Sequence, residues 1–339
     1  MTVPEFSVVV PVFDEADGLD ELHRRLCAVM DSLGSWEVVY VNDGSRDASL
    51  LRLEVMREAD ARIAIVNLSR NFGKEIATTA GLDHARGLAV IVIDADLQDP
   101  PEVIPELVAG WRAGFDMVYA QRRARAGETW LKRVTASLFY RLMDRLGRVQ
   151  MPRDTGDFRL MSRRVVNALK EMREHHRFMK GMFAWVGFPS VAVPYDRAAR
   201  HSGESKWSYW KLWNLALEGI TSFTVMPLKV ATYLGLLVAL LSVAYAGVIV
   251  VKTLILGNPV AGYPSLLTIV LFLGGVQLMT LGVIGEYLGR IFNETKQRPL
   301  YFVERFVPSD ARQRWDELAR PLVRASHGTD QPAATDSCS

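Results

Sequence analysis

Apolar and polar residues alternate in blocks along the first 205 residues, and the blocks predict strands and helices in turn. Short runs rich in β-branched residues have the length and composition of buried strands. They lie at 6–12, 36–41, 62–68 and 88–93. Between them, apolar residues at helical spacing predict helices over 19–33 and 75–85. Strands alternating with helices predict an α/β fold, with a mostly parallel sheet and helices on both of its faces.

Beyond residue 205 the chain becomes much more apolar. Two apolar stretches, 228–252 and 264–288, each reach the roughly 30 Å of helix that crosses the hydrocarbon core of a bilayer. Glycine and proline residues between them predict a turn, so the stretches form a hairpin of two transmembrane helices. The alternative is a pair of buried core helices, which are usually shorter and keep a polar face. The mean hydropathy of +0.08, high for a soluble chain, favours the membrane hairpin.

Basic residues around the hairpin predict its orientation. Most of them lie before the first stretch and after the second. They are Lys211, Lys229, Arg290, Lys296 and Arg298, with Lys252 alone at the turn. Because basic residues are retained on the cytoplasmic side, we expect the head and both termini in the cytoplasm. The chain would then be a multi-pass membrane protein with a cytoplasmic head at 1–205 and a cytoplasmic tail at 289–339 that is disordered towards its end.

Two further segments carry features of a membrane surface. Tryptophan, tyrosine and lysine residues gather in 206–227, which predicts a juxtamembrane helix at the bilayer interface. Within 128–146, leucines recur at helical spacing while lysines and arginines occupy the other faces. This pattern suits an amphipathic helix lying in the headgroup plane, and equally a helix packed against the sheet. The sequence leaves these two interpretations open.

Charge and composition exclude several classes of function. The 339 residues include 40 Lys and Arg against 38 Asp and Glu, a balance that does not indicate a nucleic-acid partner. Two cysteines are too few for a disulfide framework or a cysteine-rich zinc site. No glycine-rich loop follows the first predicted strand, which argues against a dinucleotide or P-loop site.

Acidic residues follow the predicted strands, at the edge of the sheet where ligands bind in such folds. Asp94 and Asp96 come directly after the run at 88–93, and Gln98 adds another oxygen two residues later. Because successive side chains of an extended chain point to opposite sides, those of Asp94, Asp96 and Gln98 point in roughly the same direction. Clustered oxygen ligands of this kind suit Mg²⁺ or Mn²⁺, which often bind one or two carboxylates together with substrate phosphates. The alternative is a solvated turn.

Five short motifs occur in a fixed order along the chain. They are VPVFDE at 10–15, NDGS at 42–45, RNFGK at 70–74, DADLQDP at 94–100 and GDFRLMS at 156–162. With them the chain resembles the family 2 glycosyltransferases that act on polyprenyl phosphate, and within that group the bactoprenol glucosyltransferases. The resemblance covers about 5–305 and implies a GT-A fold, a nucleotide-sugar-binding head.

The resemblance also implies roles for individual residues. The nucleotide sugar would be held by Pro11, Phe13, Glu15, Asp43 and Asp94, and a Mg²⁺ or Mn²⁺ ion by Asp94, Asp96 and Gln98. Asp157 occupies the position usually assigned as catalytic base, so that Asp157, Asp94 and Asp96 form the catalytic set. The acceptor phosphate would contact Arg200, Ser205 and Lys206. One departure is Asp14, where relatives often carry Asn.

Two of these roles have simpler alternatives. Asp157 could be the N-cap of a following helix, and 200–206 could be a solvated basic loop. The role of Asp157 is open even within a catalytic site. A lipid phosphate has a second pKa near 6 and is mostly a dianion at neutral pH, so it hardly needs a base. Asp157 could then orient a substrate instead of accepting a proton.

The implied activity is metal-dependent, inverting transfer of a sugar onto undecaprenyl phosphate, at the cytoplasmic face of the bacterial cytoplasmic (inner) membrane. UDP-glucose is the favoured donor, with GDP-mannose or a UDP-amino sugar as alternatives. A different class of function is a non-catalytic, lipid-binding membrane scaffold. The expected partners are the nucleotide sugar, the lipid phosphate and the bilayer, without nucleic acid. The oligomeric state stays open, with a homo-oligomer as one alternative.

Overall fold

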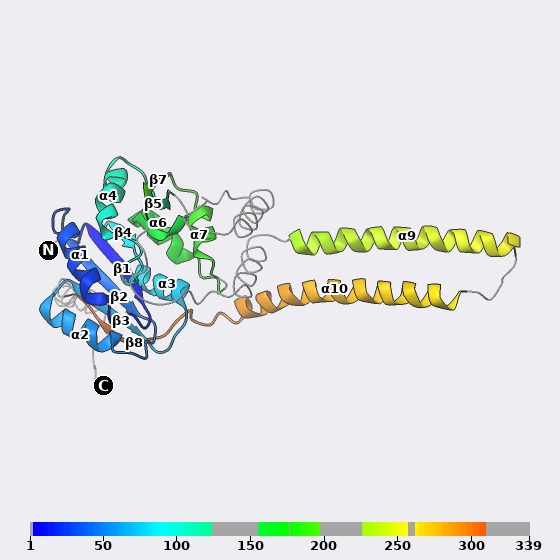
Figure 1. Cartoon of the computed structure of the whole chain (residues 1–339), viewed down its shortest axis with the longest axis horizontal. Helices are drawn as coiled ribbons and strands as arrows, with labels where there is room; N and C mark the ends of the chain where they lie inside the picture. Colours follow the sequence, from blue (N-terminus) through cyan, green and yellow to red (C-terminus); the bar gives the residue numbers. More distant parts are fainter. Residues whose placement is uncertain (1–2, 124–154, 176, 197–225, 257–261, 310–339) are drawn as a thin grey trace, which may run out of the picture.

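The computed structural model describes residues 3–123, 155–175, 177–196, 226–256 and 262–309. Within these residues, an α/β head is joined to a long hairpin of two helices that extends away from it (Figure 1). Several predicted features lie outside the described residues. They are the segment 128–146, residues 206–225 of the helix predicted at 206–227, the residues Arg200, Ser205 and Lys206, and the tail beyond 309.

The head is built on an eight-stranded sheet. In order across the sheet the strands are β7 (Ser190–Tyr195), β5 (Met117–Arg122), β6 (Thr155–Ser162), β4 (Ala89–Val92), β1 (Phe6–Val12), β2 (Trp36–Asn42), β3 (Ile63–Leu68) and β8 (Val303–Val307). The four central strands β4, β1, β2 and β3 are parallel, and β6 and β8 run antiparallel to their neighbours. The predicted α/β head with a mostly parallel sheet is therefore confirmed.

Helices cover both faces of the sheet, as the alternation along the chain predicted. They are α1 (Leu19–Met30), α2 (Ser49–Ala59), α3 (Lys74–His84), the short 3-10 helix η1 (Pro101–Val103), α4 (Ile104–Arg112), α6 (Arg163–Glu171) and α7 (Met179–Trp185). Residues of β1 divide between two cores. Val8 and Val10 pack with α1 and α4, whereas Val9 packs on the other face with α3 and α7.

Helix α3 lies unusually close to the sheet. A methyl group added at Gly81 would stand 2.3 Å from Cγ1 of Val9 and 3.1 Å from Cγ2 of Val41. A glycine at this point therefore lets the helix approach β1 and β2 directly. Because Lys74 is the first residue of α3, this contact also determines where the lysine stands at the edge of the sheet.

The sheet is completed from the far end of the sequence. Strand β8 pairs antiparallel with β3, with Phe306 opposite Val66, and Asn67 donates a hydrogen bond to Glu304 at 2.9 Å. Ser309 is buried and its hydroxyl donates to Glu37 at 3.1 Å. The head therefore does not end at residue 205, because part of the predicted tail returns to it. A five-residue strand after a long helix leaves too short a pattern for sequence periodicity to detect.

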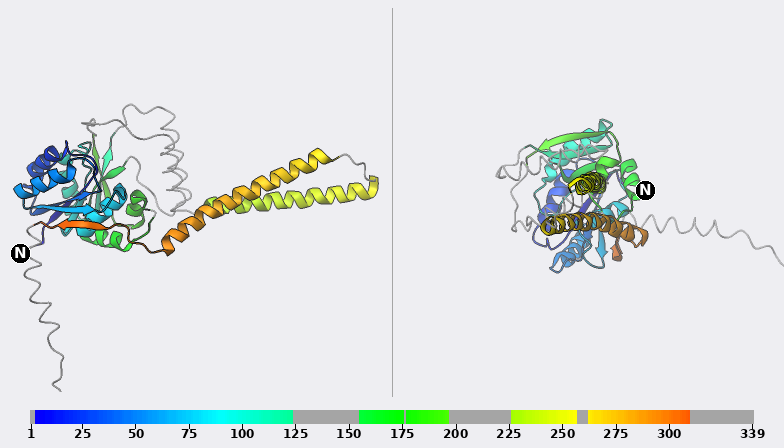
Figure 2. Two further views of the ribbon diagram at one scale, coloured as in Figure 1. Left: turned by 90° about the horizontal axis from the view of Figure 1, so that it is seen from below. Right: turned by 90° about the vertical axis from the view of Figure 1, so that its right-hand side faces the viewer.

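The hairpin consists of α9 (Met226–Leu256) and α10 (Tyr263–Thr295), which run side by side (Figures 1 and 2). Each helix is longer than the apolar stretch that predicted it. Within the described residues, one helical segment, Phe272–Thr295, has the length and apolar composition needed to cross a membrane. That both helices cross a bilayer stays a prediction.

The contact between α3 and β1 can be tested with a double-mutant cycle. We expect Gly81→Ala to destabilise the head by about 1–3 kcal/mol, because the added methyl must push α3 off Val9. Val9→Ala removes the clashing Cγ1, so the double variant should be less destabilised than the sum of the two single variants. Unfolding temperatures of the four proteins measure this coupling. Strict additivity would contradict the close approach.

Candidate active site

The register of β4 and β6 brings two carboxylates together. Val92 of β4 stands opposite Arg159 of β6 in an antiparallel pair. Because the two strands are antiparallel, two residues after Val92 and two residues before Arg159 are again opposite each other. These residues are Asp94 and Asp157, and they lie beyond the carboxyl end of β4. Asp157 lies inside β6, and the following helix α6 begins at Arg163, so the N-cap alternative for Asp157 is wrong.

Lys74 stands between these two carboxylates. Its ammonium nitrogen Nζ is 2.7 Å from both side-chain oxygens of Asp94 and 2.7 Å from Oδ2 of Asp157. The carboxylate side chains are mostly buried, 21% and 14% exposed, while the lysine side chain remains 44% exposed. Sequence reasoning did not single out Lys74, although it ends the motif at 70–74 that follows β3 at the same edge of the sheet.

The three groups affect one another's charge. Burial alone would raise the pKa of Asp157, but Lys74, assisted by Lys180 and Arg159, lowers it to about 2. Burial and the neighbouring charge of Asp157 raise the pKa of Asp94 to about 6, whereas Lys74 acts to lower it. The two carboxylates hold the pKa of Lys74 well above its usual range, although burial acts the other way. Lys74 is thus the charged partner of both buried carboxylates at once.

A second ring of titratable groups surrounds Asp157. The guanidinium of Arg159 is buried, donates to the carbonyl oxygen of Gly156 at 2.7 Å and lies 3.7 Å from the ring centre of Phe183. Burial lowers the pKa of Arg159 to about 10, although Asp157 opposes this. Glu75, next to Lys74 on α3, accepts the backbone N–H of Met179, and burial together with Asp157 raises its pKa to about 8. Neither Glu75 nor Arg159 had a signal in the sequence alone, because their role depends on burial.

The predicted metal ligands present suitable oxygens. Within the described part of the chain, Oδ1 of Asp157 is buried and accepts no hydrogen bond, whereas Oδ1 of Asp94 lies 2.7 Å from the ammonium of Lys74. A buried carboxylate oxygen without a donor is unfavourable, and a cation would satisfy it. Asp96 accepts the backbone N–H of Gln98 at 3.1 Å across a turn in which Leu97 has a φ of 59°. Carboxylate and amide oxygens are the ligand types that Mg²⁺ and Mn²⁺ take, and their joint binding of one ion by Asp94, Asp96 and Gln98 stays a prediction.

A separate group of potential ligands lies elsewhere in the head. Among the described residues, the His, Cys, Asp and Glu side chains that come close enough together to share one ion are His23, Cys27 and Asp60. They lie near the amino end of β3, away from Asp94. The guanidinium of Arg62 already donates to Asp60 at 2.7 Å and to Cys27 at 3.5 Å, so this cluster has its own cation.

The residues predicted to bind the nucleotide lie at the ends of β1 and β2. Phe13 is 40% exposed just beyond β1, and Pro11 is half-buried within it. Asp43 is buried, and its two oxygens accept the backbone N–H groups of Phe72 and Gly73 at 2.7 and 2.9 Å. Asp43 thus fixes the loop from which Lys74 projects, a role that the sequence did not suggest.

Two residues that follow β1, Asp14 and Glu15, are held by hydrogen bonds to residues that follow β2. The backbone N–H of Glu15 donates to the hydroxyl of Ser49 at 3.0 Å. Asp14, with a φ of 54°, accepts the backbone N–H of Arg46 at 2.7 Å. The structure therefore brings Phe13, Asp43, Asp94 and Asp157 to one edge of the sheet, from segments that are far apart in the sequence.

A mostly parallel sheet with acidic groups at its carboxyl edge defines a GT-A-like α/β head, joined here to a helical hairpin. The chain belongs to glycosyl transferase family 2, whose sequence model matches residues 7–170. A second model, described as the GtrB C-terminal hairpin, matches residues 226–291. The family resemblance predicted from the five motifs is thus confirmed.

Similar proteins cover almost the whole chain. An uncharacterized glycosyltransferase of Synechocystis sp. is 56% identical over 304 residues, 89% of this chain and 95% of that protein. The bactoprenol glucosyl transferase of Shigella phage SfV is 49% identical over 88% of this chain and 98% of its own length. A prophage bactoprenol glucosyl transferase homolog of Escherichia coli is 48% identical over 89% of this chain and 99% of its own.

The raised pKa of Glu75 predicts a pH-dependent stability. A carboxyl whose pKa is about 8 in the folded protein, against 4.5 ordinarily, favours folding below pH 4.5 and loses this contribution as the pH rises through 8. Glu75→Gln should therefore raise the unfolding temperature at pH 8 by about 2–4 °C or more, and change it little at pH 5. Glu58→Gln, an exposed change on α2, is the matched control. A variant with the pH dependence of the wild type would contradict the burial argument.

Proposed function

We propose that this protein transfers a sugar from a nucleotide sugar onto undecaprenyl phosphate, with UDP-glucose as the favoured donor. The observation that carries the proposal is the pair of buried carboxylates, Asp94 and Asp157, at the carboxyl edge of a family 2 head. The identity and coverage of the relatives named bactoprenol glucosyl transferases support the glucose donor and the lipid acceptor.

We propose that Asp94, Asp96 and Gln98 hold a Mg²⁺ or Mn²⁺ ion together with the donor diphosphate. The mostly buried carboxylate of Asp94, just before the turn in which Asp96 accepts the backbone N–H of Gln98, supports this assignment. When bound, such an ion neutralises the charge that builds on the departing diphosphate. Pro11, Phe13, Glu15 and Asp43 would hold the base and ribose at the neighbouring strand ends.

The acceptor phosphate is its own nucleophile in this mechanism. It is mostly a dianion at neutral pH and attacks the anomeric carbon from the side opposite the leaving diphosphate, which inverts the configuration. A carboxylate with a pKa of about 2 is a weak proton acceptor, so Asp157 would orient the acceptor or the sugar. Arg200, Ser205 and Lys206 stay predicted contacts of the acceptor phosphate.

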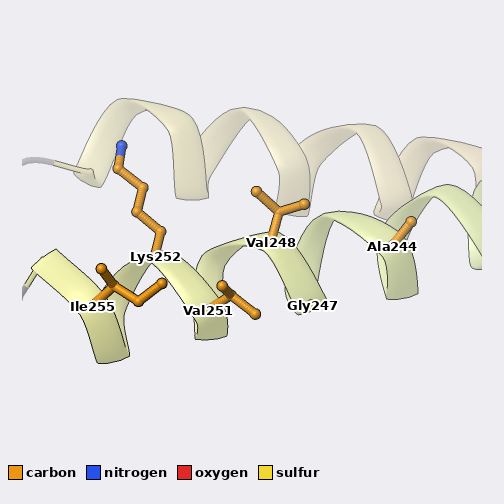
Figure 3. A pocket seen from close by; sticks show the side chains of 6 residues that line it. All are labelled: Ala244, Gly247, Val248, Val251, Lys252 and Ile255. Atoms are coloured by element: carbon orange, nitrogen blue, oxygen red, sulfur yellow. The ribbon is translucent and has the colours of Figure 1, made fainter.

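The hairpin would hold this head at the cytoplasmic face of the bacterial cytoplasmic membrane. At the far end of α9, Lys252 is the one charged residue in a groove lined by Ala244, Gly247, Val248, Val251 and Ile255 (Figure 3). Its amino group extends away from the apolar side chains at the end of its stem (Figure 3). A lysine near a helix end does this where the hydrocarbon core meets water. This supports a membrane boundary at the turn and a crossing by both helices.

A donor screen separates the alternatives. With purified protein, undecaprenyl phosphate and Mg²⁺ or Mn²⁺, we expect transfer from UDP-glucose in preference to GDP-mannose or a UDP-amino sugar. Asp96→Asn should lower the rate by about 100-fold or more while the unfolding temperature is retained, because diphosphate stabilisation is lost. Glu58→Gln serves as the surface control. Absence of transfer from every donor would favour the non-catalytic scaffold.

The topology is tested by thiol labelling of intact cells. Cys27 and Cys338 are first replaced by serine. A cysteine introduced at position 258, between the two helices, should react with a membrane-impermeant reagent. A cysteine at Lys296, an exposed residue just beyond α10, should react only after the cells are opened. The reverse pattern would refute the orientation, and labelling of both positions in intact cells would refute two crossings.

A further inference from the structure

We propose that Lys74 is an exchangeable counterion of the active site. Its ammonium group bridges Asp94 and Asp157 while no divalent ion is bound, and it moves to a phosphate oxygen of the donor when the metal and the nucleotide sugar enter. The proposal rests on the proposed function in one respect, because it takes the donor to be a metal-bound nucleoside diphosphate sugar.

The charges at the site favour such an exchange. Lys74 contributes one positive charge against the two carboxylates at 2.7 Å, and the opposed register of β4 and β6 keeps those carboxylates together. A divalent cation added beside Asp94 would reverse the balance and leave Lys74 next to a like charge. A diphosphate then brings new negative charge to the same edge of the sheet. Lys74 therefore pairs with the two carboxylates before the metal binds and with the diphosphate afterwards.

The structure lets the side chain of Lys74 move while its backbone stays fixed. The loop before it is held by Asp43, which accepts the N–H groups of Phe72 and Gly73. Gly73 has a φ of 99°, and no atom of the described residues lies within 4 Å of a methyl group placed on it, so these residues leave space beside Lys74. The lysine stem is flexible and 44% exposed, in contrast to the buried guanidinium of Arg159.

Asp157 keeps cationic neighbours when Lys74 leaves. Lys180 and Arg159 both lower the pKa of Asp157, and Arg159 is anchored by the carbonyl of Gly156 and the ring of Phe183. Removing the only partner of a buried charge is strongly unfavourable. Because two other cations remain nearby, Lys74 can move without leaving Asp157 uncompensated. A purely structural ion pair would gain nothing from this second set of cations.

The test compares Mn²⁺ affinity with and without UDP, using the full-length chain in detergent. The variants are Lys74→Met, which keeps the length and removes the charge, Lys74→Arg, which keeps the charge, and the exposed control Lys296→Met. Without nucleotide, electron paramagnetic resonance of free Mn²⁺ should show Lys74→Met binding the ion about 5-fold or more tightly than wild type, a typical coupling between linked sites. Lys74→Arg and Lys296→Met should bind it no more tightly than wild type.

With saturating Mn²⁺ the effect should reverse. Calorimetric titration should show UDP binding to Lys74→Met about 5-fold or more weakly than to wild type, because the lysine now contacts phosphate. This change of sign distinguishes an exchanging cation from a structural one. Equal Mn²⁺ affinity in wild type and Lys74→Met, with unchanged unfolding temperatures, would overturn the proposal, and so would unchanged UDP affinity.

A measurement on the wild-type protein covers the case in which Lys74→Met fails to fold. Lys74 should be protected from an amine-acylating reagent in the free protein, become more reactive with Mn²⁺ alone, and be protected again with Mn²⁺ and UDP, as read by mass spectrometry. Unchanged reactivity in all three states would refute the exchange. Absence of Mn²⁺ binding in every variant would overturn this proposal together with the metal assignment. Normal Mn²⁺ results without transfer to undecaprenyl phosphate would overturn only the proposed acceptor.

Discussion

Two carboxylates that the strand register forces together are the constraint on which the rest of the site depends. Asp94 and Asp157 face each other beyond the end of β4, where the register of β4 and β6 brings their backbones opposite one another. Two buried like charges at this distance are unfavourable unless cations compensate them. Lys74 bridges the two carboxylates, and the charges of Arg159 and Lys180 also act on Asp157.

The scaffold around this pair places its cation accurately. Gly81 lets α3 approach β1, and Asp43 holds the loop that begins the helix, so the backbone of Lys74 is positioned from both sides. These contacts use residues that do no chemistry themselves. Substitutions in α3 or in its preceding loop would therefore change the electrostatics of Asp94 and Asp157 without touching either residue.

The head and the hairpin are joined by specific contacts at the end of α10. The backbone N–H of His175 donates to Glu294 at 2.8 Å, and its ring Nε2 bonds the carbonyl oxygen of Arg298 at 2.8 Å. Tyr301 then donates to Asp83 at 2.7 Å, and β8 adds itself to the edge of the sheet. The chain thus returns from the hairpin into the head, so that the end of α10 has a defined place beside the catalytic domain.

Local patterns in the sequence were enough to predict much of this architecture. Runs of β-branched residues and helical spacing determine strands and helices through short-range geometry, so the α/β head and the positions of α9 and α10 followed from them. The acidic residues after β1, β2 and β4 were predicted to share one edge, because parallel strands end on the same side. The five ordered motifs identified the family, which the comparisons confirmed.

Only the tertiary structure showed which of those residues meet. The position of β6 beside β4 depends on packing between segments more than sixty residues apart, and it decides that Asp157 faces Asp94 and is not a helix N-cap. Lys74 acquires its role from its contacts with Asp94 and Asp157, and Glu75 from its burial, neither of which a single sequence reveals. The return of β8 to β3 depends on an open strand edge and on contacts such as that of Glu304 with Asn67, which form only in the folded head. Sequence periodicity determines elements, whereas pairing and burial determine the site, because charge interactions depend on distances that only the folded chain sets.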